Sequence, residues 1–194
     1  MKKFVISLLS VIFLCAAATA QVLVGMTDTT AYFPQLEGRR VAVLANHTAV
    51  ARFCAGAPGA AADTAVRLPG AASDGTIHLV DLLHGRGFDV TGIFSPEHGF
   101  RGTADAGEHV ASSVDAATGI PIRSLYDGNT KRPSDEAMRS FDVLVVDMQD
   151  VGLRFYTYYI TMLRMMDACA ESGRSVIVLD RPNPNGHHVD GPVL

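Results

Sequence analysis

The sequence predicts an α/β fold, with a Rossmann-like, mostly parallel sheet and helices on both of its faces. Four short runs are rich in Val, Ile and Leu, and near-continuous apolar runs of this kind are typical of strands that are covered on both faces. These runs are residues 40–45, 88–94, 141–148 and 175–179. Segments with helical spacing lie between them, and alternating strands and helices favour a parallel sheet with right-handed crossovers.

Three segments between the apolar runs are expected to be helical. Residues 76–85 and 158–172 carry apolar side chains at helical spacing, and the second of these segments ends at Gly173, a residue type that favours helix termination. Residues 133–140 begin with Pro133, which is favoured in a first turn, and two acidic residues follow near the positive end of the helix dipole. The expected packing faces are Ile77, Val80, Leu83 and His84 in the first segment, and Leu163, Met166, Cys169 and Ala170 in the last.

The composition is that of a globular protein with one domain of ordinary size. Of the 194 residues, 48% are hydrophobic and 19% are charged, which supplies a buried core and argues against disorder throughout. The formal net charge of −4 leaves no overall basic surface, so a nucleic-acid partner is not expected.

The first twenty residues have the three parts of a secretory signal peptide. Two lysines precede an apolar stretch, residues 4–14, and Ala18 and Ala20 supply the small side chains of a cleavage site. The apolar stretch is shorter than the about 20 residues that a membrane-spanning helix needs. We therefore expect residues 1–20 to be removed during export, which leaves residues 21–194 as a periplasmic or extracellular protein without membrane attachment.

Two stretches interrupt the alternation of strands and helices. Residues 51–73 are rich in Ala and Gly and are expected to form a flexible surface insertion. Residues 96–122 are polar and Gly-rich, and loops of such length within compact domains are often functional. Cys54 and Cys169 remain after cleavage; export permits a disulfide between them, but a lone buried thiol is the commoner outcome.

Polar side chains follow each of the four predicted strands. Because ligands of open α/β sheets bind beyond the carboxyl ends of the strands, clusters at four such ends are expected to line one crevice. The alternative is that these side chains cap helices or tie loops together. The clusters are residues 46–48 (NHT), residues 95–99 (SPEHG), the group of Asp147, Gln149, Asp150 and Arg154, and residues 180–183 (DRPN).

The polar clusters favour catalysis by carboxyl groups. The sequence contains no GxxxxGK[ST] or GxSxG motif and no GxGxxG after the first strand, which disfavours dinucleotide enzymes and serine hydrolases, and no cofactor is expected. Glycoside hydrolysis needs an acid and a second carboxylate, and Glu97 is the best candidate for the acid, with a structural carboxylate as the alternative. Asp147, Asp150 and Asp180 are candidates for the partner, although aspartates at strand ends also serve as helix N-caps.

Three arginines near the clusters are candidates for binding an anionic substrate group through bidentate contacts, with loop-holding ion pairs as the alternative. They are Arg101, Arg154 and Arg181. Three histidines, His98, His187 and His188, raise the alternative of a metal-dependent hydrolase. That indication is weak, because His187 and His188 are adjacent and adjacent side chains rarely point the same way, so no metal site is predicted.

Five motifs that follow one another along the chain carry a resemblance to a known family. They are residues 44–48 (LANHT), 94–102 (FSPEHGFRG), 124–126 (SLY), 147–158 (DMQDVGLRFYTY) and 178–184 (VLDRPNP). With these motifs the chain resembles the exo-β-N-acetylmuramidase family (NamZ, also called YbbC-like), long catalogued as a domain of unknown function. The resemblance covers about residues 36–194, and several long motifs in the right order argue against a chance match.

The resemblance implies an exo-acting glycoside hydrolase that removes N-acetylmuramic acid from the non-reducing ends of peptidoglycan fragments, for cell-wall recycling or nutrient scavenging. It also implies a Rossmann-like N-terminal domain, a smaller C-terminal domain and an active site in the cleft between them. Glu97 matches the family's catalytic glutamate, and the lactyl carboxylate of muramic acid gives a physical reason for arginines in the site. The positions that match motifs expected to line the cleft are Asn46, His98, Arg101, Gln149, Asp150, Arg154, Tyr156, Asp180 and Arg181.

The sequence departs from the family pattern in three places. The insertion after Val50 is longer than usual, Asp127 stands where a glycine is common, and the chain stops at Leu194, where family members continue into a second half. We therefore expect residues 21–194 to be the N-terminal catalytic domain of a two-domain enzyme, weakly active or inactive alone. A non-catalytic module that binds cell-wall sugars is the alternative, and a metal-dependent hydrolase is a third hypothesis.

Overall fold

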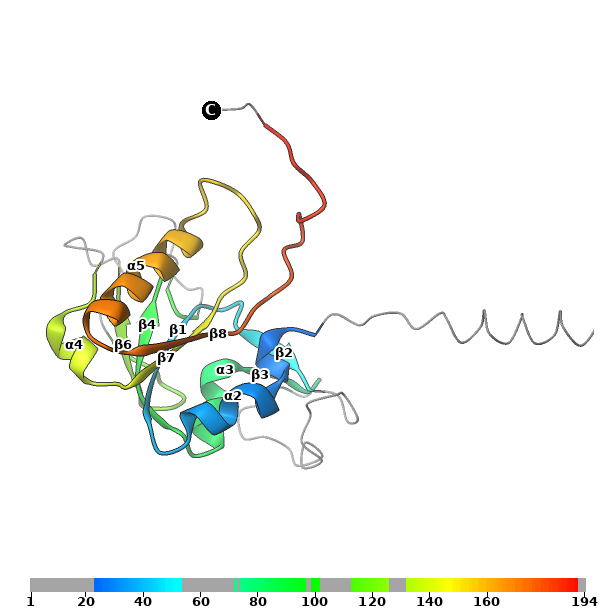
Figure 1. The fold of residues 1–194 in the computed structure, drawn as a ribbon. Coiled ribbons are helices and arrows are strands. Elements are labelled where there is room, and N and C mark those ends of the chain that lie inside the picture. The colour runs from blue at the N-terminus through cyan, green and yellow to red at the C-terminus, as the bar shows by residue number, and fades with distance from the viewer. Residues whose placement is uncertain are drawn as a thin grey trace, which may run out of the picture.

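A six-stranded sheet lies at the centre of the structure, a computed structural model that describes residues 23–53, 72, 74–96, 99–101, 113–125 and 132–191 (Figure 1). The strands are β1 (Arg40–Ala45), β4 (Asp89–Ser95), β5 (Ser113–Val114), β6 (Pro121–Ser124), β7 (Val143–Asp147) and β8 (Ser175–Val178). Their order is β5-β6-β4-β1-β7-β8, and every pair is parallel except β5 with β6. The predicted α/β class with a mostly parallel sheet is confirmed.

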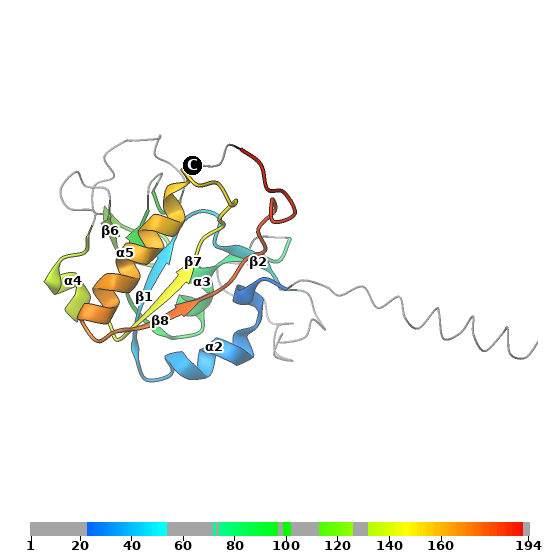
Figure 2. The same cartoon turned by 45° about the horizontal axis from the view of Figure 1, so that its top comes forward.

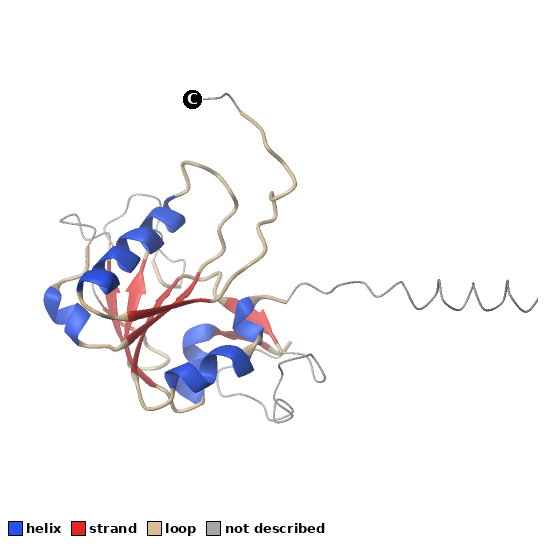
Figure 3. Cartoon of the chain, viewed as in Figure 1, coloured by secondary structure: helices blue, strands red, loops and turns tan. Residues whose placement is uncertain are grey.

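Helices cover both faces of this sheet, which Figures 2 and 3 show from two directions. Two helices pack on one face, α2 (Thr29–Leu36) and α3 (Leu79–Gly85), and two on the other, α4 (Asp135–Arg139) and α5 (Thr157–Glu171). A 3-10 helix, η1 (Gly25–Thr27), precedes α2. A small antiparallel pair of strands, β2 (Val50–Arg52) and β3 (Thr76–His78), forms a second sheet.

The two central strands are buried on both of their faces. In β1, Val41 and Val43 pack into the cluster under α2 and α3, whereas Ala42 and Leu44 pack into the cluster under α4 and α5. The neighbouring strand β7 alternates in the same way between the two clusters. Because successive side chains of a strand point to opposite faces, both sides of each strand must be apolar. This requirement is the reason for the continuous apolar runs.

The four predicted strands are confirmed with small shifts at their ends. The run 88–94 forms a strand one residue later, and the run 141–148 forms a shorter strand, Val143–Asp147. The strand β6 was not predicted, because Ile122 is its only strongly apolar residue and it begins with a proline. It nevertheless pairs in parallel with β4, with Ile93 opposite Ile122, and its proline stands at the first position, where a strand tolerates it.

Two of the three predicted helices begin later than expected. In the segment 76–85, residues Thr76–His78 form β3, and the helix starts only at Leu79 after His78 accepts a hydrogen bond from the Val80 N–H at 3.2 Å. The predicted helix over residues 133–140 likewise begins later, as α4 at Asp135. There Pro133 lies ahead of the helix, and the Ser134 hydroxyl caps it by accepting from the Ala137 N–H at 3.2 Å.

The long helix α5 is confirmed, but the predicted packing face is wrong for three of its four residues. Leu163 is 49% exposed and Met166 is 38% exposed, and Ala170 is exposed as well. The buried residues are Tyr158, Thr161, Met165, Ala168 and Cys169. The helix carries two apolar stripes, and Thr161 joins the buried one because its hydroxyl donates to the Thr157 carbonyl at 3.0 Å, which satisfies its polar group.

Cys169 is a free thiol in the core, where burial raises its pKa to about 11. Cys54, most of the predicted insertion and the predicted signal peptide lie outside the described residues. The first residues of the expected insertion, Ala51 and Arg52, belong to β2 instead. Within the part of the chain that the structure describes, no helix combines the length and the apolar character needed to cross a membrane.

An exposed ion pair at the start of β1 makes the stability of the fold depend on pH through one carboxyl group, that of Asp142. The Arg40 guanidinium and backbone N–H both bind the Asp142 carboxylate, at 2.6 Å for Nη2–Oδ1 and 3.0 Å for N–Oδ2, and these bonds lower the Asp142 pKa from 3.8 to about 2. A carboxyl group whose pKa is lower in the folded state than in the unfolded state stabilises the fold at pH values above its unfolded-state pKa. That contribution is lost as the pH falls toward about 2.

Asp142→Asn is therefore expected to be less stable than the parent at pH 6, and the difference should vanish as the pH falls from about 4 to about 2. Urea unfolding of both proteins across this pH range measures the difference. All other acidic groups are common to the two proteins and cancel. A difference that stays constant at every pH would contradict the lowered pKa of Asp142.

Candidate functional site

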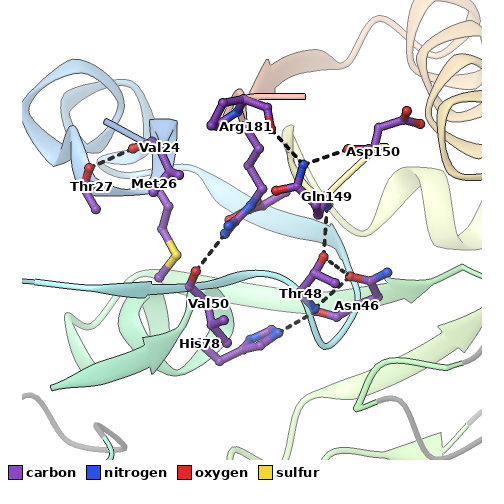
Figure 4. A network of polar contacts seen from close by, with 12 residues as sticks. Val24, Met26, Thr27, Asn46, Thr48, Val50, His78, Gln149, Asp150 and Arg181 are labelled. Carbon is purple, nitrogen blue, oxygen red and sulfur yellow. Dashed lines mark hydrogen bonds and ion pairs between the residues drawn. The ribbon is translucent and has the colours of Figure 1, made fainter. Parts of the chain in front are cut away.

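Polar residues beyond β1 and β7 are joined by hydrogen bonds at the carboxyl edge of the sheet (Figure 4). Asn46 follows β1, and its Oδ1 accepts from the backbone N–H of Thr48 at 3.0 Å and from the Thr48 hydroxyl at 2.6 Å. The Thr48 hydroxyl oxygen in turn accepts from the backbone N–H of Gln149, which follows β7, at 2.9 Å. The loop after β1 is thus fixed to the end of β7.

The Gln149 side chain extends this network to the loop after β8. Its Nε2 donates to the carbonyl of Asp150 at 2.7 Å and to the carbonyl of Pro182 at 3.0 Å. The ends of β1, β7 and β8 therefore meet in one network, whose bonds tie the loops together; a ligand crevice shared by the four clusters stays a prediction. Asn46, Gln149 and Asp150 serve in it as structural hydrogen-bonding groups.

Asp147 and Arg181 form a buried ion pair beneath this network. The Asp147 side chain is 0% exposed and that of Arg181 is 7% exposed. Arg181 binds both carboxylate oxygens through Nε and Nη2, and Nη2 also donates to the Val50 carbonyl at 3.1 Å. Burial raises the pKa of Asp147, and the Arg181 guanidinium opposes that rise. For Arg181, the alternative of a loop-holding ion pair is the one that the structure shows.

His78 is a residue of this edge that sequence reasoning did not single out for the site. The Val80 N–H donates to its Nδ1, so the neutral ring carries its proton on Nε2, which donates to the Asn46 carbonyl at 2.9 Å. Burial lowers the pKa of His78, which keeps the ring neutral. On the other side of this contact, the side-chain Nδ2 of Asn46 is buried and has no hydrogen-bond partner among the described residues. No motif marks His78, because its role depends on β3 lying beside the loop after β1.

Arg101 lies apart from this network and binds two other carboxylates, those of Asp81 and Asp115. Its Nη2 contacts Asp81 at 3.1 Å and Asp115 at 3.0 Å, and its guanidinium lies over the Phe100 ring at 4.7 Å from the centroid. The structure therefore does not bring Arg101 together with Arg181. Its observed role is again the alternative, an ion pair that joins the start of α3 to the segment before β6.

Asp150, Asp180, Arg154 and Tyr156 lie on the two loops that leave β7 and β8. One carboxylate oxygen of Asp150, Oδ1, accepts from the Gly152 N–H at 2.7 Å, while Oδ2 is buried without a hydrogen-bond partner among the described residues. Asp180 and Arg154 are exposed, and the Tyr156 ring meets the Tyr158 ring edge-on at 4.6 Å. The Asp150 carbonyl belongs to the network, and all four residues lie on loops next to the start of α5.

The backbone beside Asp180 is packed against Gly25 of η1. The Gly25 N–H donates to the Asp180 carbonyl at 2.7 Å, and a Cβ at Gly25 would lie 2.6 Å from the Asp180 nitrogen. No side chain fits at that distance. Glycine at position 25 is therefore what allows η1 to hold the end of β8 in place.

Glu97 and His98 lie outside the described residues, so the roles predicted for them stay predictions. The segment that leads to them begins at Ser95, the buried last residue of β4, whose carbonyl accepts from the Leu125 N–H at 3.1 Å. The strand β4 pairs with β1, so this segment starts at the same edge of the sheet. Among the described residues, no group of three or more His, Cys, Asp or Glu side chains is placed to hold a metal ion.

An open, mostly parallel sheet with polar side chains collected beyond its carboxyl edge defines an α/β domain of the ligand-binding class. The chain belongs to the family of N-terminal domains of NamZ, because residues 63–194 match the family described as "Exo-beta-N-acetylmuramidase NamZ, N-terminal". The resemblance carried by the motifs is confirmed.

The chain is also similar to three individual proteins. The peptidoglycan beta-N-acetylmuramidase NamZ of Bacillus subtilis (strain 168) is 50% identical over 117 residues, which are 59% of this chain and 28% of that protein. A DUF1343 family protein of Bacteroides fragilis matches with a TM-score of 0.66 and 46% identity, over 90% of this chain and 39% of that one. A second one matches with a TM-score of 0.63 and 34% identity, over 84% and 35%. The chain thus spans well under half the length of each.

Arg181→Met is expected to lower the free energy of unfolding by about 3–5 kcal/mol, because it leaves the Asp147 carboxylate buried without its cation. Urea denaturation measures the loss, and adding Asp147→Asn should recover part of it. The control is Arg52→Met, which breaks a pair with Asp74 whose side chains are 58% and 52% exposed, so that water screens the pair and the loss should be much smaller. Equal losses in the two arginine variants would contradict a desolvated pair at this edge.

Proposed function

We propose that this protein is an exo-acting glycoside hydrolase that releases N-acetylmuramic acid from the non-reducing ends of peptidoglycan fragments. The observation that carries the proposal is the family match over residues 63–194, together with 50% identity to a relative named peptidoglycan beta-N-acetylmuramidase. The polar residues gathered beyond the carboxyl edge support it, because that edge is where open α/β sheets bind their ligands.

Glu97 is the proposed general acid, which protonates the glycosidic oxygen as the bond to the leaving sugar breaks. The buried state of Asp147 argues against it as the second carboxylate, because Arg181 occupies both of its oxygens and no surface of the side chain is exposed. Asp150 and Asp180 remain as candidates for the second carboxylate. Both belong to the loops that leave the sheet at the proposed site.

The lactyl carboxylate of muramic acid needs a cation, and three arginines are the candidates for it. The guanidinium groups of Arg101 and Arg181 already bind aspartates. Arg154 is exposed on the loop between β7 and α5, in the motif that also carries Asp150 and Tyr156. Because Arg154 is exposed on a loop at the proposed site, we propose it as the residue that binds the lactyl group.

We also propose that the protein is exported and acts on cell-wall fragments in the periplasm or outside the cell, in wall recycling or nutrient scavenging. Residues 1–20 have the pattern of a signal peptide, and the proposed substrate lies outside the cytoplasmic membrane. Peptidoglycan-derived sugars are then the partners of the site.

The exported protein is expected to begin at Gln21, because Ala18 and Ala20 form the small-residue cleavage site. Intact-mass spectrometry of the protein from the periplasmic or extracellular fraction measures the amino terminus. Ala20→Tyr should keep the leader attached, since a bulky side chain does not fit at the cleaved position. An unprocessed parent protein in the exported fraction would contradict the leader assignment.

Glu97→Gln is expected to lower kcat on a natural disaccharide with terminal N-acetylmuramic acid by about 100-fold or more, since general acids contribute about 10²–10⁴-fold. The same variant should lose much less on 4-nitrophenyl β-N-acetylmuramide, whose leaving group departs without a proton. Steady-state kinetics of the full-length natural protein measure both. The control Glu136→Gln removes an exposed carboxylate in the first turn of α4 and should change neither rate.

Four results would redirect the assignment. Equal losses on the two substrates would make Glu97 a nucleophile or base instead of the acid, and undiminished activity would remove it from the chemistry. Binding of N-acetylmuramic acid without turnover by the parent would favour the sugar-binding module. Loss of activity with a chelator would favour metal-dependent hydrolysis.

A further inference from the structure

A small pocket opens beside the network, between the ends of β7 and β8 and the first turns of α5. Its volume is about 130 Å³. One wall is apolar, with Met148, Met162 and Val178, and two tyrosines, Tyr158 and Tyr159, close it on the side of α5. Asp150, Asp180 and Arg181 supply its charged groups.

The size of this pocket limits what it holds. Binding sites for whole small molecules have volumes of about 300–1,000 Å³, so a sugar ring with its substituents does not fit. The 130 Å³ of this pocket is less than half of the lower end of that range. It therefore fits one substituent of a few heavy atoms.

The charges of the pocket select against an anion. Arg181 is the cation in its wall, but its guanidinium is bound to the buried Asp147 carboxylate. Asp150 and Asp180 leave the pocket with an excess of negative charge. A carboxylate such as the lactyl group is repelled, whereas a neutral group that donates a hydrogen bond is favoured.

Asp150 offers the acceptor for such a donor. Its Oδ1 is held by the Gly152 N–H, and its Oδ2 is buried and has no hydrogen-bond partner within the described residues. An unsatisfied acceptor of this kind costs free energy, and a donor supplied by a ligand removes that cost. The methionine and valine side chains beside it provide a surface for an apolar end group.

We propose that this pocket receives the 2-acetamido group of the terminal sugar, with the methyl group packed among Met148, Met162 and Val178 and the amide N–H donated to Asp150. The four heavy atoms of the group match the size of the pocket. The inference rests on the proposed function, because it assigns a subsite for the amino sugar of that substrate. The pocket would then select N-acetylated sugars by shape and by one hydrogen bond.

The test compares three 4-nitrophenyl β-muramides that differ at carbon 2, with an N-acetyl, an N-butyryl or an O-acetyl group. In the full-length natural protein, kcat/KM should fall at least about 10-fold for N-butyryl, since two added methylenes overfill the pocket. The O-acetyl sugar lacks the N–H donor and should also lose at least about 10-fold, because Asp150 is left unpaired.

Met162→Ala widens the pocket and should raise the ratio of N-butyryl to N-acetyl kcat/KM by about 10-fold, while the O-acetyl penalty remains. Met166→Ala is the matched control, since Met166 lies on the same helix, is 38% exposed and does not line the pocket. It should leave all ratios as in the parent. Ratios between substrates cancel any loss of folded protein.

An N-butyryl to N-acetyl ratio that Met162→Ala leaves unchanged would overturn the pocket assignment, and the proposed function would stand because the parent hydrolyses the N-acetyl sugar. A parent that hydrolyses none of the three sugars would overturn the proposed function. In that case calorimetry tests the pocket assignment. The ratio of the affinities for N-butyrylmuramic acid and N-acetylmuramic acid is measured for the parent, Met162→Ala and Met166→Ala, and only Met162→Ala should raise it.

Discussion

The buried ion pair of Asp147 and Arg181 is the interaction on which the carboxyl edge of the sheet depends. Two charges removed from water are tolerated only where each satisfies the other with good geometry, which fixes the ends of β7 and β8 relative to one another. Arg181 also binds the Val50 carbonyl, so the start of β2 is held by the same group. A small displacement of any of these elements would leave a buried charge without its partner.

The remaining hydrogen bonds of the edge build on this fixed point. With β7 and β8 in place, Gln149 lies within reach of Pro182, and the Gln149 backbone receives Thr48 from the loop after β1. Gly25 closes the arrangement from the outside, because only a residue without a side chain fits against the Asp180 backbone. The result is a floor of polar groups joined by hydrogen bonds around one buried ion pair, and such supporting bonds hold a binding site in its productive geometry.

Much of this edge could be predicted from the sequence, because parallel strands buried on both faces leave polar side chains only at their ends. That rule placed Asn46, Gln149 and Arg181 together. It does not say what each group binds. Arg101 has Asp81 and Asp115 as partners 20 and 14 residues away, and such pairing depends on how the chain folds back. The packing face of α5 was predicted wrongly for a related reason. The helix carries two apolar stripes, and only the surface it packs against determines which of them is buried.

The strand order sets the distance that the loop with Glu97 has to bridge. Neighbouring strands lie about 4.8 Å apart, and β4 is separated from the gap between β7 and β8 by β1 and β7, so the two points are about 12 Å apart. The loop with Glu97 leaves β4, and the acetamido pocket lies at the gap. The acetamido group is on the carbon next to the one whose bond is broken, so Glu97 has to reach over the ends of β1 and β7 to act on a sugar held in the pocket. Most polar groups of the floor beneath it bind one another, so contacts from the rim and from that loop must supply the chemistry.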